Sequence, residues 1–143
     1  MLIIIADRGV MTGVAIQRAL LESIPEIDVV TCLSWNDYKN AERKPVKGVA
    51  SRLAQGPADT IVLSAWTVKG FSSPGDFAAK VKTVREDVPV YVYNGAQFEL
   101  FAEAIEAYLP ACRRGESVES VVVPFFRKVI EGWKPRFIQM GLF

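Results

Sequence analysis

Short apolar blocks alternate with amphipathic stretches along the chain, and this alternation predicts its secondary structure. The first block is rich in isoleucine and ends at Asp7, as expected of a strand that is covered on both faces. Four later blocks are of the same short, apolar kind. The five predicted strands span residues 2–6, 28–32, 60–64, 88–93 and 119–123.

Apolar residues at helical spacing follow these blocks. Thr12 is a candidate N-cap for a first helix, which Pro25 ends. Residues 72–76, SSPGD, supply a cap, a proline for the first turn and an acid, and so predict the start of another helix. The remaining helices are predicted over residues 46–54, over a stretch that carries Phe98, Phe101, Ala102, Ile105 and Leu109, and from Pro124 through Phe125, Val129 and Ile130.

Five alternations of strand and helix predict an α/β fold. Parallel strands need right-handed crossovers that cover both faces of the sheet, so we expect three layers. The number and length of the units favour a doubly wound, flavodoxin-like sheet of five parallel strands in the order 2-1-3-4-5. We expect one domain over residues 1–133 and an apolar tail over residues 134–143. Function in such sheets tends to lie at the carboxyl ends of the strands, here Asp7, Ser34, Ser64, Asn94 and Val123.

Composition narrows the function classes. The chain has 143 residues, half of them hydrophobic, and a formal net charge of +1, so no long-range field would hold it on nucleic acid or an anionic membrane. We therefore expect neither as a partner. The last third is locally basic, and we interpret this cluster as a solvated face. It consists of Arg113, Arg114, Arg127, Lys128, Lys134 and Arg136.

Cysteine and histidine usage excludes further chemistry. The chain has no histidine, and Cys32 and Cys112 are far apart in sequence, so metal-site spacing, Cys-His pairs and Ser-His-Asp triads are absent. Cys32 lies in an apolar strand pattern and is expected to pack as a small hydrophobe. The opening MLIII is too short for a signal peptide and runs straight into Asp7 and Arg8. We expect a cytoplasmic protein with reduced thiols.

Four segments lie in register along the chain: IIIAD, TIVLSAWTVKG, DVPVYVYNGA and ESVVVPFFRKVI. Together they resemble the CheY-like receiver domains of bacterial response regulators. IIIAD resembles the strand that ends in paired acids, and TIVLSAWTVKG resembles the strand that ends in the phosphoacceptor aspartate. DVPVYVYNGA and ESVVVPFFRKVI resemble the two later strands, which in the family end in Thr or Ser and in Lys-Pro-Phe. The resemblance covers residues 2–133 and implies the same fold and a role in signal transduction.

The departures from the family pattern imply that the phosphotransfer chemistry is lost. Ser64 stands where the resemblance places the phosphoacceptor, and Val123 stands where it places the lysine. The paired acids are replaced by Ala6 and Asp7. One carboxylate cannot assemble a magnesium site, and a neutral serine without a base is a weak nucleophile. Asn94 keeps some hydrogen-bonding character in this degenerate pocket. We therefore interpret the chain as a pseudo-receiver with neither enzymatic activity nor a cofactor.

Such a domain would act by protein contact, with a partner or as a homo-oligomer such as a dimer. The resemblance implies an interaction face formed by Phe98, Phe101, Ile105, Tyr108, Phe125, Phe126 and Arg127. Core packing is the favoured reading for Phe98, Phe101 and Ile105, because a helix on a sheet buries one stripe. Adjacent Phe125 and Phe126 cannot both face one core, so one is expected to be exposed or in an interface. Trp133 and Phe137 begin an apolar end that either packs back on the domain or contacts a partner.

Two alternatives stay open. VVVPFFRKVIEGW resembles the exit from the receiver-like N-terminal wing of pyridoxal-phosphate-dependent basic amino acid decarboxylases, which would make the chain an assembly domain. The other is a small flavodoxin-like enzyme or a protein that binds a nucleotide or another ligand. Arg8 and Gly9 follow the first strand, where phosphate groups often bind, and Trp66 could stack on a flat ligand. That loop lacks G-x-G-x-x-G and a P-loop lysine, which favours a plain connection.

Overall fold

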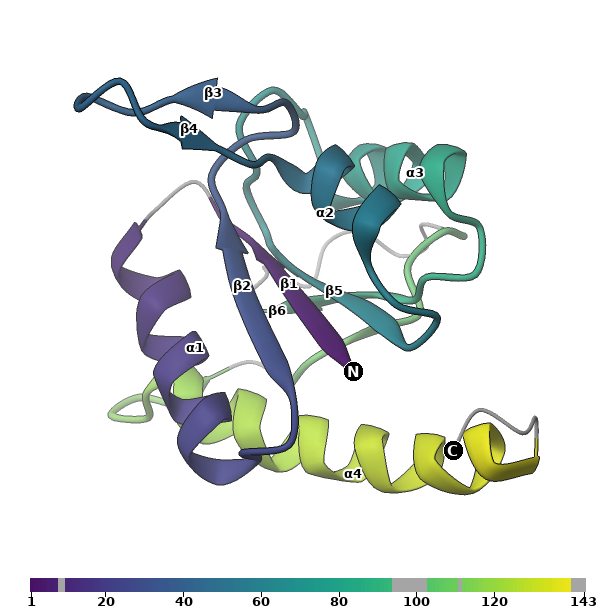
Figure 1. Ribbon diagram of the computed structural model, residues 1–143. Coiled ribbons are helices and arrows are strands. Elements are labelled where there is room, and N and C mark those ends of the chain that lie inside the picture. Colours follow the sequence, from purple (N-terminus) through teal and green to yellow (C-terminus); the bar gives the residue numbers. More distant parts are fainter. Residues whose placement is uncertain (8–9, 94–102, 111, 140–143) are drawn as a thin grey trace.

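A computed structural model describes residues 1–7, 10–93, 103–110 and 112–139 and shows an α/β protein built on one parallel sheet (Figure 1). Five strands form this sheet in the order β2-β1-β5-β6-β7. They are β1 (Leu2–Ala6), β2 (Asp28–Cys32), β5 (Thr60–Ala65), β6 (Val90–Tyr93) and β7 (Ala107–Tyr108). Two further strands, β3 (Tyr38–Lys39) and β4 (Pro45–Val46), pair with each other as a separate antiparallel hairpin.

Helices cover both faces of the sheet (Figure 1). One face carries α1 (Val10–Ser23) and α4 (Val118–Gln139), and the other carries α2 (Val49–Gln55) and α3 (Pro74–Val84). The predicted three-layer arrangement is therefore observed. Among the described helices, none has both the length and the apolar character needed to span a bilayer.

The isoleucine run at the start of the chain forms a central strand, as predicted. Ile3, Ile4 and Ile5 are fully buried. Because side chains alternate across a strand, Ile3 and Ile5 join the core under α1 and α4, and Ile4 joins the core under α2 and α3. A strand covered on both faces has no polar side to present, which is why its sequence is apolar throughout.

The predicted start of the third helix is confirmed in detail. The Ser73 hydroxyl accepts a hydrogen bond from the Asp76 backbone N–H at 3.1 Å, and Pro74 occupies the first turn. Phe77 and Val81 are buried, whereas Val84 is 39 % exposed. Two other helix boundaries differ from the prediction. Thr12 is not an N-cap but lies inside α1, and α2 begins after Gly48 because residues 45–46 belong to β4.

The predicted fifth strand is wrong, because residues 119–123 lie within α4. Val122, Phe126 and Ile130 recur every four residues, and all three are buried against the sheet. This helical stripe outweighs the strand preference of three successive valines. Pro124 therefore lies inside the helix instead of opening it, and α4 continues through residue 133 to Gln139.

The edge strand of the sheet is instead β7, in a segment predicted to be helical. The Glu106 N–H donates to the Val90 carbonyl at 2.8 Å, and the Leu109 N–H donates to the Val92 carbonyl at 2.8 Å. Ile105 and Leu109 contact opposite cores, which one helical stripe could not do. The predicted order 2-1-3-4-5 thus changes in two respects: the edge segment is different, and the unpredicted hairpin adds β3 and β4 to the numbering.

Candidate functional site

Three strand ends form a row at the carboxyl edge of the sheet. Ala65 pairs with Tyr93, and the β1–β5 register continued by one residue places Asp7 opposite Ala65. All three side chains lie on the face of the sheet that α1 and α4 cover. Ala65 and Tyr93 belong to the core on that face. Ala6 belongs to the core under α2 and α3, and because side chains alternate along the chain, Asp7 points to the opposite face. The Tyr93 hydroxyl donates a hydrogen bond to the Asp7 carboxylate. Ala65 is small enough for the tyrosine ring to pass over it.

The environment of Tyr93 keeps its phenol protonated. The side chain is only 2 % exposed. Burial raises the pKa of Tyr93, and the hydrogen bond to Asp7 and the negative charge of that carboxylate raise it further. The pair is therefore a neutral donor on a carboxylate acceptor, an arrangement that fixes the Asp7 side chain and does not supply a base at Tyr93.

Ser64 lies inside the sheet and not at its surface. Its side chain is fully buried, and its hydroxyl donates to the Ala65 carbonyl at 2.8 Å. Strand β5 extends one residue beyond the predicted end, so the chain emerges after Ala65. Its neighbours Leu63 and Ala65 belong to the core under α1 and α4, so Ser64 points to the face covered by α2 and α3. Ser64 and Asp7 therefore lie on opposite faces of the sheet.

The structure does not gather the predicted receiver pocket into one site. Asp7 and Ser64 lie on opposite faces, and Val123 lies on α4 instead of at a strand end. Asn94, Arg8 and Gly9 are outside the described residues. In the described part of the chain, no three His, Cys, Asp or Glu side chains are grouped closely enough to hold a metal ion.

Trp66 and Tyr108 meet at the same edge of the sheet. Trp66 follows β5 and Tyr108 ends β7, and their rings lie 6.3 Å apart at an interplanar angle of 45°. Tyr108 is 38 % exposed and Trp66 is half-buried. Trp66 thus packs against an aromatic side chain of the protein itself at the end of the sheet. This contact gives Trp66 a packing role, in contrast to the predicted role of stacking on a flat ligand.

The predicted interaction face is partly internal. Phe126 is fully buried and Phe125 is half-buried. Both rings pack edge-on against the ring of Tyr91, with distances between ring centroids of 5.7 Å for Phe126 and 5.5 Å for Phe125. The two neighbours therefore share one aromatic contact, contrary to the expectation that only one faces the core. Arg127 and Tyr108 are exposed. The side chains of Trp133 and Phe137 are outside the described part of the structure.

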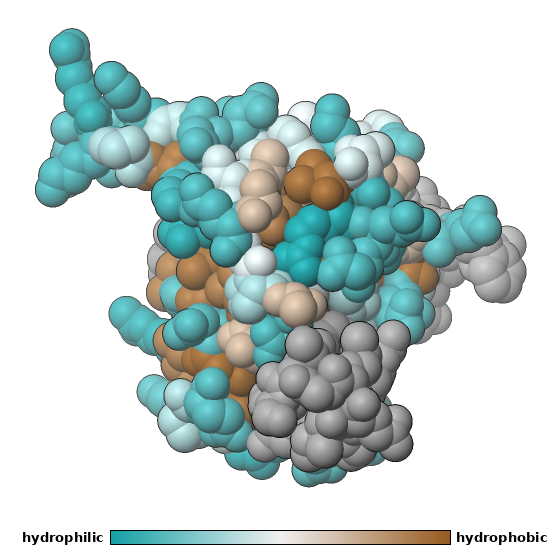
Figure 2. All heavy atoms as spheres, turned by 45° about the vertical axis from the view of Figure 1, so that its right-hand side comes forward, coloured by the Kyte–Doolittle hydropathy of each residue, from teal (hydrophilic) through white to brown (hydrophobic). Residues whose placement is uncertain are grey.

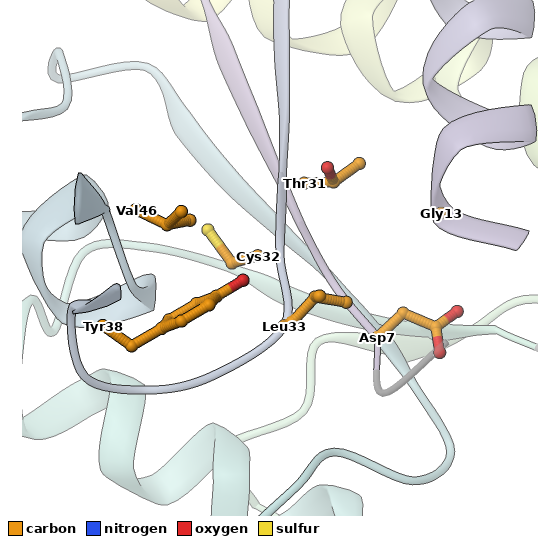
Figure 3. A pocket seen from close by; sticks show the side chains of 7 residues that line it. All are labelled: Asp7, Gly13, Thr31, Cys32, Leu33, Tyr38 and Val46. Carbon is orange, nitrogen blue, oxygen red and sulfur yellow. The ribbon is translucent and has the colours of Figure 1, made fainter. Parts of the chain in front are cut away.

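A small cavity opens beside Asp7 at the free edge of β2 (Figure 3). Its volume is about 130 Å³, against about 300–1,000 Å³ for typical ligand sites. Asp7 and Gly13 lie on one side of β2 and the hairpin residues Tyr38 and Val46 on the other (Figure 3). The remaining lining residues are Thr31, Cys32 and Leu33. The space bounded by these residues is too small for a nucleotide or a flavin.

The cysteine in this cavity is not activated. Cys32 is 2 % exposed, and burial raises its pKa to about 11, although the positive charge of Arg52 opposes the shift. A thiol that stays protonated is a poor nucleophile. Cys32 therefore packs as a small hydrophobe, as the sequence predicts.

Tyr93, Tyr38 and the hairpin are features of this edge that the sequence analysis missed. Alternation in VYVY places Tyr91 and Tyr93 on one face, but only the order of the strands reveals that Tyr93 lies two strands from Asp7.

No protein family matches the sequence, and no curated protein is similar enough to it to be called a relative.

Proposed function

We propose that this chain is a receiver-like domain of flavodoxin-like fold that acts by protein contact and does not transfer phosphoryl groups. The observation that carries the proposal is the burial of Ser64, whose hydroxyl is donated to the Ala65 carbonyl at 2.8 Å. A phosphoacceptor must meet its phosphodonor at the surface, and Ser64 has no exposed atoms. A serine sealed in a sheet is a structural residue.

The state of Asp7 supports the same proposal. Its carboxylate accepts the Tyr93 hydroxyl, and Ser64 lies on the other face of the sheet. Phosphoryl transfer needs several carboxylate oxygens around a magnesium ion and a cation for the developing charge. Asp7 by itself provides one carboxylate, and the other residues that line the cavity beside it add apolar, hydroxyl and thiol groups.

A domain without a catalytic centre acts through its surface. A cytosolic location fits its two free thiols, Cys32 and Cys112. The exposed residues of the predicted interaction face, Tyr108 and Arg127, remain candidates for contact. Phe126 is removed from that list because it is fully buried.

The test is intact-mass measurement together with light scattering on a sizing column, after incubation with acetyl phosphate and magnesium and beside an untreated sample. We expect no mass gain and the same oligomeric state in both samples. A gain of one phosphoryl group, or a change of oligomer on treatment, would overturn the proposal. Ser64→Ala and Asp7→Asn, treated in parallel, would then identify the acceptor.

A further inference from the structure

The hairpin forms a positively charged arm. We define the basic arm as residues 38–46, which comprise β3, β4 and the turn between them. Every residue from 39 to 45 is exposed. Lys39, Arg43 and Lys44 provide three cations against the single carboxylate of Glu42, so the formal net charge of the arm is +2, whereas that of the whole chain is +1. The arm projects from the body in Figure 1 and is a narrow hydrophilic projection in Figure 2.

The tip of the basic arm has a defined conformation. The Asn40 side-chain oxygen accepts hydrogen bonds from the backbone N–H groups of Glu42 and Lys44, each at 3.0 Å. The Arg43 N–H donates to the Asn40 carbonyl at 2.9 Å. These bonds hold Arg43 at φ 59°, a left-handed conformation that costs free energy for any residue with a side chain. The most strained position of the turn thus presents an arginine at the tip.

The base of the arm is fastened to α2. The Asp37 carboxylate accepts from the Gly48 N–H at 2.8 Å and from the Ser51 hydroxyl at 2.7 Å. These two bonds lower the pKa of Asp37, the Gly48 bond most strongly. Gly48 is required here, because an added Cβ would lie 2.4 Å from the Trp35 carbonyl oxygen. A surface element that is already ordered loses less conformational entropy when it binds.

We propose that the basic arm docks on a carboxylate-rich surface of a protein partner. This inference rests on the proposed function, since it names the surface through which a contact domain would act. Arginine at the tip offers a planar fork of donors that matches a carboxylate, and the two lysines add point charges on either side of the turn. The fixed turn holds these three donors at the end of a narrow projection, where a partner can reach them.

The charge pattern favours protein over nucleic acid as the partner. Glu42 lies 3.7 Å from Lys44 at the tip, and a phosphate backbone would repel it, whereas a protein surface can offer it a matching donor. The one aromatic residue of the arm, Tyr38, is half-buried against the cavity, so it is not free to stack on bases.

The test uses the full chain and a fluorescein-labelled decaglutamate peptide, followed by fluorescence anisotropy from low to physiological salt. Single-stranded and duplex DNA of equal charge are measured beside it. K39E/R43E/K44E reverses the cations of the arm, and K39Q/R43Q/K44Q removes them with less disturbance. R113E/R114E/K128E is the matched control, because it makes the same change of charge at exposed positions outside the arm. Circular dichroism confirms that each variant is folded.

We expect decaglutamate to bind the wild type more tightly than either DNA, with affinity that falls as salt rises. The arm variants should bind at least about tenfold more weakly, since each exposed ion pair contributes modestly, and the control should bind like the wild type. No binding at low salt, equal loss in the control, or tighter binding of DNA would overturn the inference. Phosphorylation by acetyl phosphate would instead overturn the proposed function and leave the peptide result standing, so the two failures are distinguishable.

Discussion

The Tyr93 hydroxyl donates a hydrogen bond to the Asp7 carboxylate across the small side chain of Ala65. The three residues lie at the carboxyl ends of three neighbouring strands, so the bond ties the ends of β1 and β6 together over β5. A phenol that is buried against a carboxylate is an anchor at the edge where sheets of this kind usually place their chemistry. This anchor fixes one side of the cavity beside the basic arm.

Removing the hydroxyl tests how much the anchor contributes. Tyr93→Phe is expected to lower the free energy of unfolding by about 1–3 kcal/mol, because a hydrogen bond to a charged group is lost in a buried site. Urea unfolding at neutral pH measures the change. Ala65→Leu should have a comparable effect by blocking the path of the ring, and a Tyr93→Phe variant as stable as the wild type would show that the bond contributes nothing.

Stability should fall at alkaline pH because of the buried thiol. Burial raises the pKa of Cys32 from 9.0 to about 11, so the folded state keeps a proton that the unfolded state releases. The resulting stabilisation is fully present below pH 9 and is lost as the pH rises to about 11; it amounts to about 2–3 kcal/mol at most. Cys32→Ala should show a correspondingly shallower fall between these limits, measured by urea unfolding. Equal slopes in the two proteins would contradict the assignment.

Restoring an aspartate at the predicted phosphoacceptor position should damage the fold. Ser64 is fully buried within β5, so Ser64→Asp would place a carboxylate in an apolar environment. We expect a loss of about 3 kcal/mol or more, or no folded protein, whereas Ser64→Ala should cost about 1 kcal/mol or less. Thermal unfolding of the two variants checks this. A stable Ser64→Asp protein that gains mass with acetyl phosphate would contradict this prediction and show that the side chain at this position is accessible to a phosphodonor.

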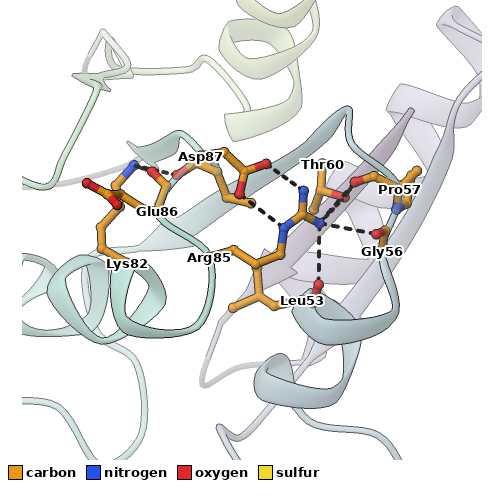
Figure 4. Close-up of polar contacts among 9 residues, drawn as sticks. Leu53, Gly56, Pro57, Thr60, Lys82, Arg85, Glu86 and Asp87 are labelled. Carbon is orange, nitrogen blue, oxygen red and sulfur yellow. Dashed lines mark hydrogen bonds and ion pairs between the residues drawn. The ribbon is translucent and has the colours of Figure 1, made fainter. Parts of the chain in front are cut away.

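Arg85 joins two helices and a loop (Figure 4). It lies within hydrogen-bond distance of Thr60, the first residue of β5, and so at the opposite end of the parallel sheet from Asp7, which follows the last residue of β1. One guanidinium nitrogen donates to the carbonyls of Gly56 at 3.2 Å and Pro57 at 2.9 Å, and the other side of the fork binds Asp87 at 2.7 Å. The nitrogen that binds Gly56 and Pro57 also lies within hydrogen-bond distance of the Leu53 carbonyl and the Thr60 hydroxyl.

Replacing Arg85 should therefore lower the free energy of unfolding by more than the loss of one positive charge explains. Arg85→Ala is expected to lower the free energy of unfolding by about 2–3 kcal/mol. Arg85→Lys should recover only part of it, because an ammonium group cannot span acceptors on both sides of the fork. Lys44→Ala removes an exposed ion pair with Glu42 and serves as the control, with a change of about 0.5 kcal/mol or less. Full rescue by lysine would show that the network geometry is unimportant.

Patterns that local physics governs were read correctly from the sequence. The isoleucine run predicts a doubly buried strand because an all-apolar segment has no face to give to water, and β1 spans Leu2–Ala6 as expected. The SSPGD segment predicts a helix start because a hydroxyl, a proline and an acid each satisfy a need of the first turn, and Ser73 caps α3. Burial of Cys32 was predicted from its apolar strand pattern in the same way.

Periodicity and capping within a few residues were therefore enough to predict the α/β class, four of the five sheet strands and the burial of Cys32. The helix at residues 119–123 depended instead on packing between distant segments, because the stripe of Val122, Phe126 and Ile130 gains more by packing on the sheet than three valines gain in a strand. The same is true of the contact between Tyr93 and Asp7 and of the burial of Ser64, since the order of the strands decides which side chains from distant segments share a face.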